Sequence, residues 1–137
     1  LLGAYYGSSL GLLVLIGYLM MGKKSRPIPL SFLALTAGAA GLGGMLAYAA
    51  YRERIGPRMM ELPDHHCLYC LLQYQPWSIV IFSLFVLGSF LSIWPLLLHW
   101  LVPSQAFVEQ VSVLDRRLFS GAFLCLSIAL LMTWILS

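Results

Sequence analysis

The sequence predicts an all-α membrane protein with about four transmembrane helices and a short Cys/His-rich loop between the second helix and the third. Two observations support this fold class. The 137-residue chain is 61% hydrophobic and only 9% charged, whereas a soluble domain carries about 25% charged residues. Its apolar residues also form four long runs, and roughly 20 helical residues are enough to cross the hydrocarbon core of a bilayer.

The four runs contain no Asp, Glu, Lys or Arg and are the predicted transmembrane helices. They cover residues 1–22, 30–51, 77–102 and 118–137. Lys23 and Lys24 follow the first run, and Pro103 follows the third. Pro95 lies inside the third run and is expected to kink that helix. The Ser92 hydroxyl, one turn earlier, is expected to help satisfy the freed backbone groups.

Small residues recur at helical spacing in the first two predicted helices. The repeats are Gly3, Gly7 and Gly11 in the first helix, and Ala37/Gly41 and Ala40/Gly44 in the second. Small side chains let membrane helices approach closely, because apolar side chains gain little from leaving lipid. We therefore expect these faces to form a tight hairpin between the first two helices.

The stretch 104–117 is less apolar than the four runs. Phe107, Val108, Val111 and Leu114 recur at spacings typical of one helix face, while Glu109, Asp115 and Arg116 are charged. This pattern predicts a short helix lying at the membrane interface, with the charged side chains among the lipid headgroups.

The membrane orientation follows from the distribution of basic residues. The loops before residue 30 and after residue 102 share one side and hold five Lys or Arg, whereas the loop between the second and third helices holds three. The positive-inside rule therefore places the Cys/His loop on the outer side of the membrane. We expect a bacterial inner (plasma) membrane protein with the lipid bilayer as its main environment.

The loop 55–76 concentrates the reactive side chains in the segment Asp64-His65-His66-Cys67-Leu68-Tyr69-Cys70. It holds two of the three Cys and two of the three His of the chain. A CxxC pair near a helix start favours thiol–disulfide chemistry, because a helix N-terminus or a neighbouring imidazolium stabilises the reactive thiolate. The catalytic candidates are Cys67 as the attacking thiolate, Cys70 as the resolving thiol and His66, or His65, as the group that tunes the pKa.

The same loop also suits a metal ion, which is an alternative hypothesis. Two thiolates and imidazole match the ligands of Zn(II), and nearby thioethers favour Cu(I). Adjacent imidazoles cannot both easily face the two sulfurs, so a two- or three-ligand transfer site is favoured over a closed structural site. The candidate ligands are His65, His66, Cys67, Cys70, Met59 and Met60.

Two motif look-alikes are set aside. A c-type haem site requires His directly after CxxC, and Leu71 occupies that position. Asp64-His65-His66-Cys67 spells the signature of the DHHC palmitoyltransferases, but that family surrounds the motif with a longer Cys/His-rich zinc framework that this short loop does not contain.

The segment Cys67-Leu68-Tyr69-Cys70-Leu71, leading into an apolar helix, resembles the CxYC helix start of bacterial vitamin K epoxide reductase-like proteins. It also resembles the CxxC segment of the DsbB family. Both are small four-helix membrane enzymes that pass electrons between a thiol partner protein and a quinone. The resemblance implies a thiol oxidoreductase with a quinone near Gln73, Tyr74 and Trp77. A second, shuttling Cys pair, present in those families, has no counterpart here.

A third hypothesis is a non-catalytic integral subunit that packs against other membrane subunits through its glycine-rich helices. Cys125, in the middle of the fourth run, is expected to be a small buried hydrophobe. His99, near the end of the third run, is expected to be an interfacial histidine. The net charge of +3 and the lack of a basic stripe argue against a nucleic-acid partner.

Overall fold

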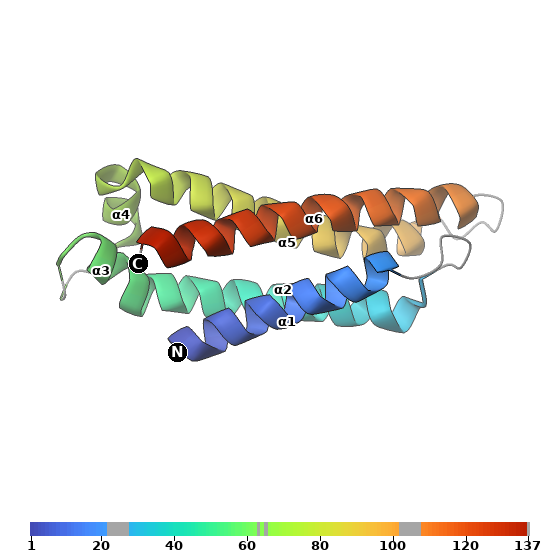
Figure 1. Ribbon diagram of the computed structural model, residues 1–137, viewed down its shortest axis with the longest axis horizontal. Coiled ribbons are helices and arrows are strands. Elements are labelled where there is room, and N and C mark those ends of the chain that lie inside the picture. Colours follow the sequence, from blue (N-terminus) through green and yellow to red (C-terminus); the bar gives the residue numbers. More distant parts are fainter. Residues whose placement is uncertain (22–27, 63, 65, 102–107, 137) are drawn as a thin grey trace.

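The computed structural model describes residues 1–21, 28–62, 64, 66–101 and 108–136, with only the backbone for 108–110. Four long helices run side by side along an elongated bundle (Figure 1): α1 (Leu2–Met21), α2 (Leu30–Ala50), α5 (Pro76–Leu101) and α6 (Val108–Leu136). Three short elements lie at one end: the π-helix η1 (Tyr51–Ile55), α3 (Gly56–Met59) and α4 (Leu68–Tyr74). The described part of the chain contains no strand.

Four helical segments are long and apolar enough to cross a membrane, which confirms the predicted fold class. They are Leu2–Met21, Leu30–Met59, Pro76–Leu101 and Val111–Leu136. Large apolar side chains such as Val14, Met45 and Trp100 are exposed on the outside of the bundle. Lipid solvates such side chains, so helices that are apolar on all sides are stable in a bilayer.

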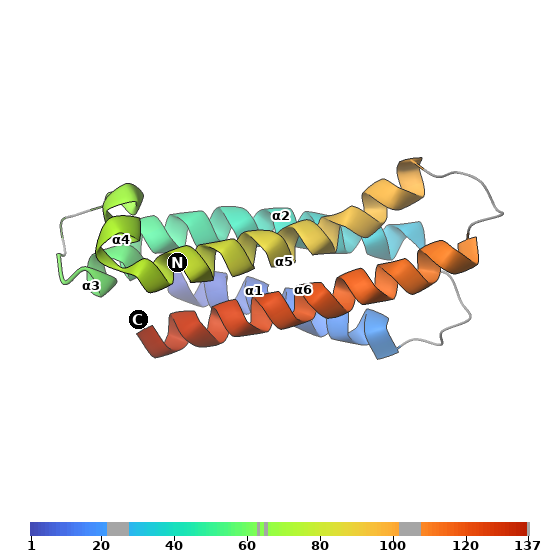
Figure 2. The same cartoon turned by 90° about the horizontal axis from the view of Figure 1, so that it is seen from above.

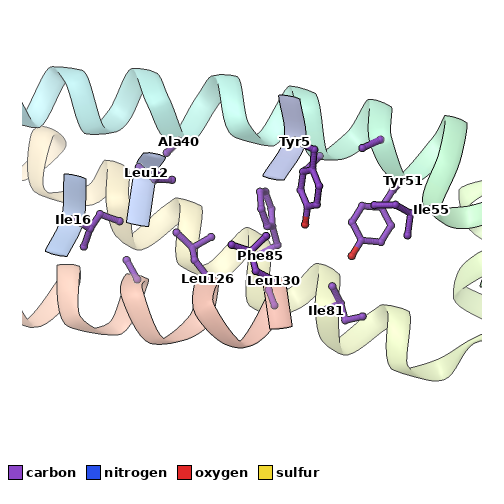
Figure 3. Packing of buried hydrophobic residues seen from close by; sticks show 14 of the residues in the cluster. Tyr5, Leu12, Ile16, Ala40, Tyr51, Ile55, Ile81, Phe85, Leu126 and Leu130 are labelled. Carbon is purple, nitrogen blue, oxygen red and sulfur yellow. The ribbon is translucent and has the colours of Figure 1, made fainter. Parts of the chain in front are cut away.

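The core lies between the four long helices, which contact one another in the closed order α1, α2, α5, α6 and back to α1. Figure 3 shows its packing, with buried side chains from each of the four long helices and from η1. Tyr5 and Tyr51 direct their hydroxyl groups toward the bundle interior (Figure 3). The Tyr51 hydroxyl is hydrogen-bonded to the Thr133 hydroxyl, which in turn donates to the Ala129 carbonyl. The Tyr51–Thr133 bond joins η1, which continues α2, to α6.

The predicted close packing through the glycines of α1 is wrong. Gly3, Gly7 and Gly11 are exposed, and a Cβ atom at any of them would meet nothing within 4 Å. The α1 side chains that are buried are larger, and they include Leu12 and Ile16. Glycines that face lipid and glycines that pack against another helix can have the same periodic spacing. The sequence alone therefore did not distinguish the two arrangements.

A close helix approach at a glycine occurs between α5 and α6 instead. A Cβ atom on Gly88 would lie 2.7 Å from Leu126 Cγ and 3.3 Å from the Ala122 carbonyl oxygen. Real Cβ atoms do not come this close to a neighbour, so the packing of α5 on α6 at this level requires glycine.

Pro95 lies buried inside α5, and Figure 2 shows the last turns of this helix bending, as expected from the missing backbone donor. The Ser92 hydroxyl donates to the Gly88 carbonyl at 2.8 Å. This acceptor lies four residues before Ser92, so the hydroxyl does not serve the Leu91 carbonyl that Pro95 leaves without a partner. The expected role of Ser92 is therefore not the one that the structure shows.

The end of the bundle opposite α4 holds a polar contact that the sequence did not predict. His99 Nε2 of α5 lies 2.9 Å from Asp115 Oδ2 of α6, and Asp115 is fully buried. Arg116 Nη1 donates to the Met20 carbonyl at 3.1 Å. Over 108–117 the chain forms the first turns of α6 rather than a separate short helix, because these side chains bond to neighbouring helices. Residues 104–107 of the predicted interfacial segment lie outside the described residues.

Replacing Asp115 by alanine is expected to destabilise the bundle, because the His99 imidazole loses its acceptor where α5 and α6 meet. The expected loss is about 1–3 kcal/mol in the free energy of unfolding, measured by thermal unfolding in detergent. Asp115→Asn is the matched control, since its amide oxygen still accepts a hydrogen bond. Equal stability of the alanine and asparagine variants would show that the contact contributes nothing.

Candidate functional site

The CxxC pair lies at the start of α4, the short helix at one end of the bundle (Figure 1). Cys67 is the N-cap residue, with extended backbone angles of φ −89° and ψ 107°. Its Sγ accepts the Cys70 backbone N–H at 3.4 Å, and its carbonyl accepts the Leu71 N–H at 3.2 Å. The sulfur therefore occupies the position that an N-cap oxygen usually takes, facing the unpaired backbone donors of the first turn.

The helix α4, which Cys67 caps, is separate from the long helix α5. Gln75 has an extended backbone, with φ −124° and ψ 90°, and Pro76 begins α5. A proline disfavours the helical conformation for the residue before it. The chain therefore turns between α4 and α5, and the dithiol sits on a short helix of its own rather than on the first turn of the membrane span.

Both thiols are free and partly exposed. The pKa of Cys67 is lowered, first by a hydrogen bond from the Cys70 thiol and then by the Cys70 backbone N–H. The pKa of Cys70 is raised, first because its S–H is held by Cys67 and then by partial desolvation. The arrangement favours a Cys67 thiolate that accepts from a protonated Cys70, which is the asymmetry a nucleophilic and a resolving thiol require.

The pH dependence of alkylation provides a direct check on this asymmetry. Because the thiolate is the reactive form, the rate of Cys67 modification by iodoacetamide is expected to reach half its maximum below the ordinary thiol pKa of about 8.5, and that of Cys70 above it. Mass spectrometry separates the two sites. Cys70→Ala removes the S–H donor but keeps the backbone N–H, so it is expected to raise the Cys67 midpoint. Equal midpoints for the two wild-type thiols would contradict the asymmetry.

Three contacts hold α4 against η1 and α3, the short elements that continue α2. The side chain of Leu71 is fully buried, and its Cδ2 lies 3.5 Å from the place of a Cβ on Gly56. Gln75 Nε2 donates to the Met59 carbonyl at 3.2 Å. Sequence reasoning missed these positioning residues, although the adjacent Gly56 and Pro57 were a visible signal of unusual backbone.

The third contact is made by His66. Its Nδ1 lies 3.1 Å from the Arg52 carbonyl oxygen. The described contacts of His66 include neither sulfur of the CxxC pair, so its predicted role as a group that tunes the pKa stays a prediction. His65 lies outside the described residues.

The residues assigned to a quinone surround the junction of α4 and α5 on the outside. Gln73, Tyr74 and Trp77 are all exposed. Gln73 Nε2 is 3.4 Å from the Tyr69 hydroxyl, which is also exposed. These side chains provide an exposed amphipathic rim beside the dithiol.

The residues assigned to a metal are divided between surface and core. Met59 and Met60 are buried, whereas Cys67 and Cys70 are partly exposed and His66 is exposed. Within the part of the chain that the structure describes, no three His, Cys, Asp or Glu side chains are grouped so that they could hold a metal ion.

A surface pocket of about 350 Å³ lies on the same end of the bundle. It is lined by Glu53, Arg54, Pro57, Arg58 and Glu61.

Comparisons of the chain with protein-family models, with curated proteins and with solved structures found no match.

Proposed function

We propose that this chain is a membrane thiol–disulfide redox protein whose Cys67 and Cys70 cycle between a dithiol and a disulfide. The observation that carries the proposal is the N-cap geometry, in which Cys67 Sγ accepts the Cys70 N–H at 3.4 Å. It places both sulfurs within one helical turn, partly exposed, with opposite pKa shifts. A structural thiol pair needs neither the exposure nor the asymmetry.

The disulfide form of the protein would oxidise a thiol partner protein in two exchanges. A partner thiolate attacks the Cys67 sulfur, the Cys67–Cys70 bond breaks, and Cys70 leaves as a thiolate and takes up a proton. The second partner thiolate then attacks the partner sulfur of the mixed disulfide and releases Cys67. The lowered pKa of Cys67 makes it the better leaving group in this step. Two electrons pass from the partner to the chain.

A membrane quinone is the proposed acceptor that regenerates the disulfide. The dithiol gives two electrons and two protons to the quinone, which becomes a hydroquinone while the Cys67–Cys70 bond forms. The exposed rim of Gln73, Tyr74 and Trp77 lies at the start of α5. Its aromatic side chains support the approach of a flat, apolar ring from the bilayer.

The proposed location is a bacterial inner membrane with the α4 end of the bundle on the outer side. This end carries the described chain termini and the short elements α3 and α4 (Figure 1). An oxidising compartment lets a disulfide persist, whereas the cytosol keeps thiols reduced.

Dithiothreitol-dependent quinone reduction by the purified protein in detergent tests this function. Wild-type protein is expected to reduce decylubiquinone, and Cys67→Ser and Cys70→Ser are expected to lose the activity. Cys125→Ser is the matched control, because Cys125 lies within α6, and it is expected to retain full activity. Oxidation of the dithiol by oxidised glutathione but not by quinone would overturn the proposal that quinone is the electron acceptor. Oxidation by neither compound would overturn the redox function itself.

The outward glycine face of α1 supports a second candidate, a non-catalytic subunit of a membrane complex. Gly3, Gly7 and Gly11 are exposed, and each leaves open space at the place of a Cβ. Gly7→Leu is then expected to abolish assembly with a membrane partner in cells while the isolated chain keeps its fold. Unchanged migration of the solubilised complex on a native gel would contradict this candidate.

A further inference from the structure

The π-helix η1, which continues α2, leaves the Arg52 backbone carbonyl without a donor at the helical spacings. In η1 the Gly56 N–H is bonded to the Tyr51 carbonyl, five residues earlier. The same spacing would pair the Arg52 carbonyl with residue 57, which is a proline and has no N–H. Because the Gly56 N–H is already engaged, the Arg52 carbonyl has no donor at the helical or π-helical spacing and is open to a donor from elsewhere.

His66 supplies this donor, with Nδ1 3.1 Å from the Arg52 carbonyl oxygen. A carbonyl only accepts hydrogen bonds, so the imidazole carries a proton on Nδ1, and its neutral form leaves Nε2 unprotonated. His66 directly precedes Cys67, the N-cap residue whose sulfur faces the first turn of α4. The bond therefore fixes the backbone on the upstream side of that sulfur.

We propose that His66 is a positioning residue for the dithiol, tying the backbone before Cys67 to the Arg52 carbonyl that Pro57 leaves free. This inference rests on the proposed thiol–disulfide function and concerns the same site. It differs from the electrostatic role expected from the sequence, in which a protonated imidazole would stabilise the thiolate by its charge. A neutral imidazole is sufficient for positioning, because Nδ1–H already donates.

The remaining anchors of α4 lie downstream of both sulfurs. Leu71 packs beside Gly56, and Gln75 donates to the Met59 carbonyl. Loss of the His66 bond would therefore leave α4 docked while its N-cap residue, Cys67, becomes free to leave the N-cap geometry. The effect is expected to be local to the reactivity of Cys67, and the stability of the bundle is expected to change little.

Alkylation of reduced protein across a pH series separates positioning from charge. His66→Asn keeps a neutral N–H donor near the place of Nδ1, and is expected to keep the Cys67 rate at pH 7 within about twofold of wild type. His66→Ala is expected to lower that rate about three- to tenfold, as for a thiol pKa raised by roughly half to one unit. If His66 acts through its charge, both variants should show the same fall in the Cys67 alkylation rate. That result would overturn the proposal.

Pro57→Ala tests the same bond from the other side. Alanine restores an N–H that competes for the Arg52 carbonyl, so Cys67 reactivity is expected to fall as in His66→Ala, and the two changes together are expected to add little. An unchanged Cys67 rate in Pro57→Ala would overturn the proposal. The alkylation assay needs neither a partner protein nor a quinone. A wild-type protein that fails to form a disulfide would overturn the proposed function, whereas the alkylation rates of the variants decide the role of His66 independently.

Discussion

Replacing Gly56 by alanine is expected to disrupt the end of the bundle that carries the dithiol. A Cβ at this position would lie 2.6 Å from the Tyr51 carbonyl oxygen. That oxygen belongs to the backbone and accepts the Gly56 N–H, so it cannot move aside as a flexible side chain would. Relief requires the π-helix η1 to rewind, which would rotate the contact with Leu71 out of place.

The expected cost of Gly56→Ala is about 2–3 kcal/mol in the free energy of unfolding, the upper part of the range for overpacking. Loss of the rapid alkylation of Cys67 should accompany it, because η1 and α3 support α4. Gly43→Ala is the matched control: Gly43 is also a buried helical glycine, but its Cβ would meet nothing within 4 Å. Thermal unfolding in detergent followed by circular dichroism measures the difference, and similar midpoints for the two variants would contradict the π-helical geometry.

Gly88→Ala is expected to separate α5 from α6. The added Cβ would lie 2.7 Å from Leu126 Cγ and 3.0 Å from Leu126 Cδ2, and the α5–α6 contact is the most extensive in the bundle. The expected destabilisation is about 1–3 kcal/mol, measured as a fall in the thermal midpoint with Gly43→Ala again as the control.

A double-mutant cycle separates this clash from any general effect of alanine at Gly88. Leu126→Ala alone removes a buried side chain and is expected to cost about 2–5 kcal/mol. In the double variant the added methyl group occupies part of the space that Leu126 leaves. The combined loss should therefore be smaller than the sum of the two single losses. Simple additivity would show that the two side chains do not meet.

The long helices were predictable because a bilayer imposes a minimum length and an apolar composition on each transmembrane helix. Each apolar run of the sequence meets both requirements on its own. The break between α4 and α5 was visible in the sequence only as Gln75-Pro76. This local signal did not lead to the prediction that the CxxC pair lies on a separate short helix. The partners of His66 and Asp115 could not be read from the sequence, because each bond joins two separate segments of the chain. The glycines of α1 illustrate the same limit: periodicity defines a face, but only the bundle decides whether that face meets a helix or lipid.

The asymmetry of the two cysteines was partly predictable. CxxC spacing near a helix start favours a low pKa for the first thiol, and the structure places Cys67 at the N-cap of α4. The support beneath α4 was not predictable, because it depends on a π-helix that follows a transmembrane helix without a break. The role of Pro57 follows only once the Gly56 N–H is seen bonded to Tyr51.

Redox equilibration of the purified protein in glutathione buffers, followed by acid quenching and mass spectrometry of differentially alkylated cysteines, tests the thiol–disulfide function most directly. We expect one reversible two-electron transition in which Cys67 and Cys70 lose their free thiols together as one internal disulfide. Cys125 is expected to stay alkylatable throughout. A protein in which Cys67 and Cys70 remain separate thiols in every buffer, or form only mixed disulfides with glutathione, would contradict the function proposed for this site.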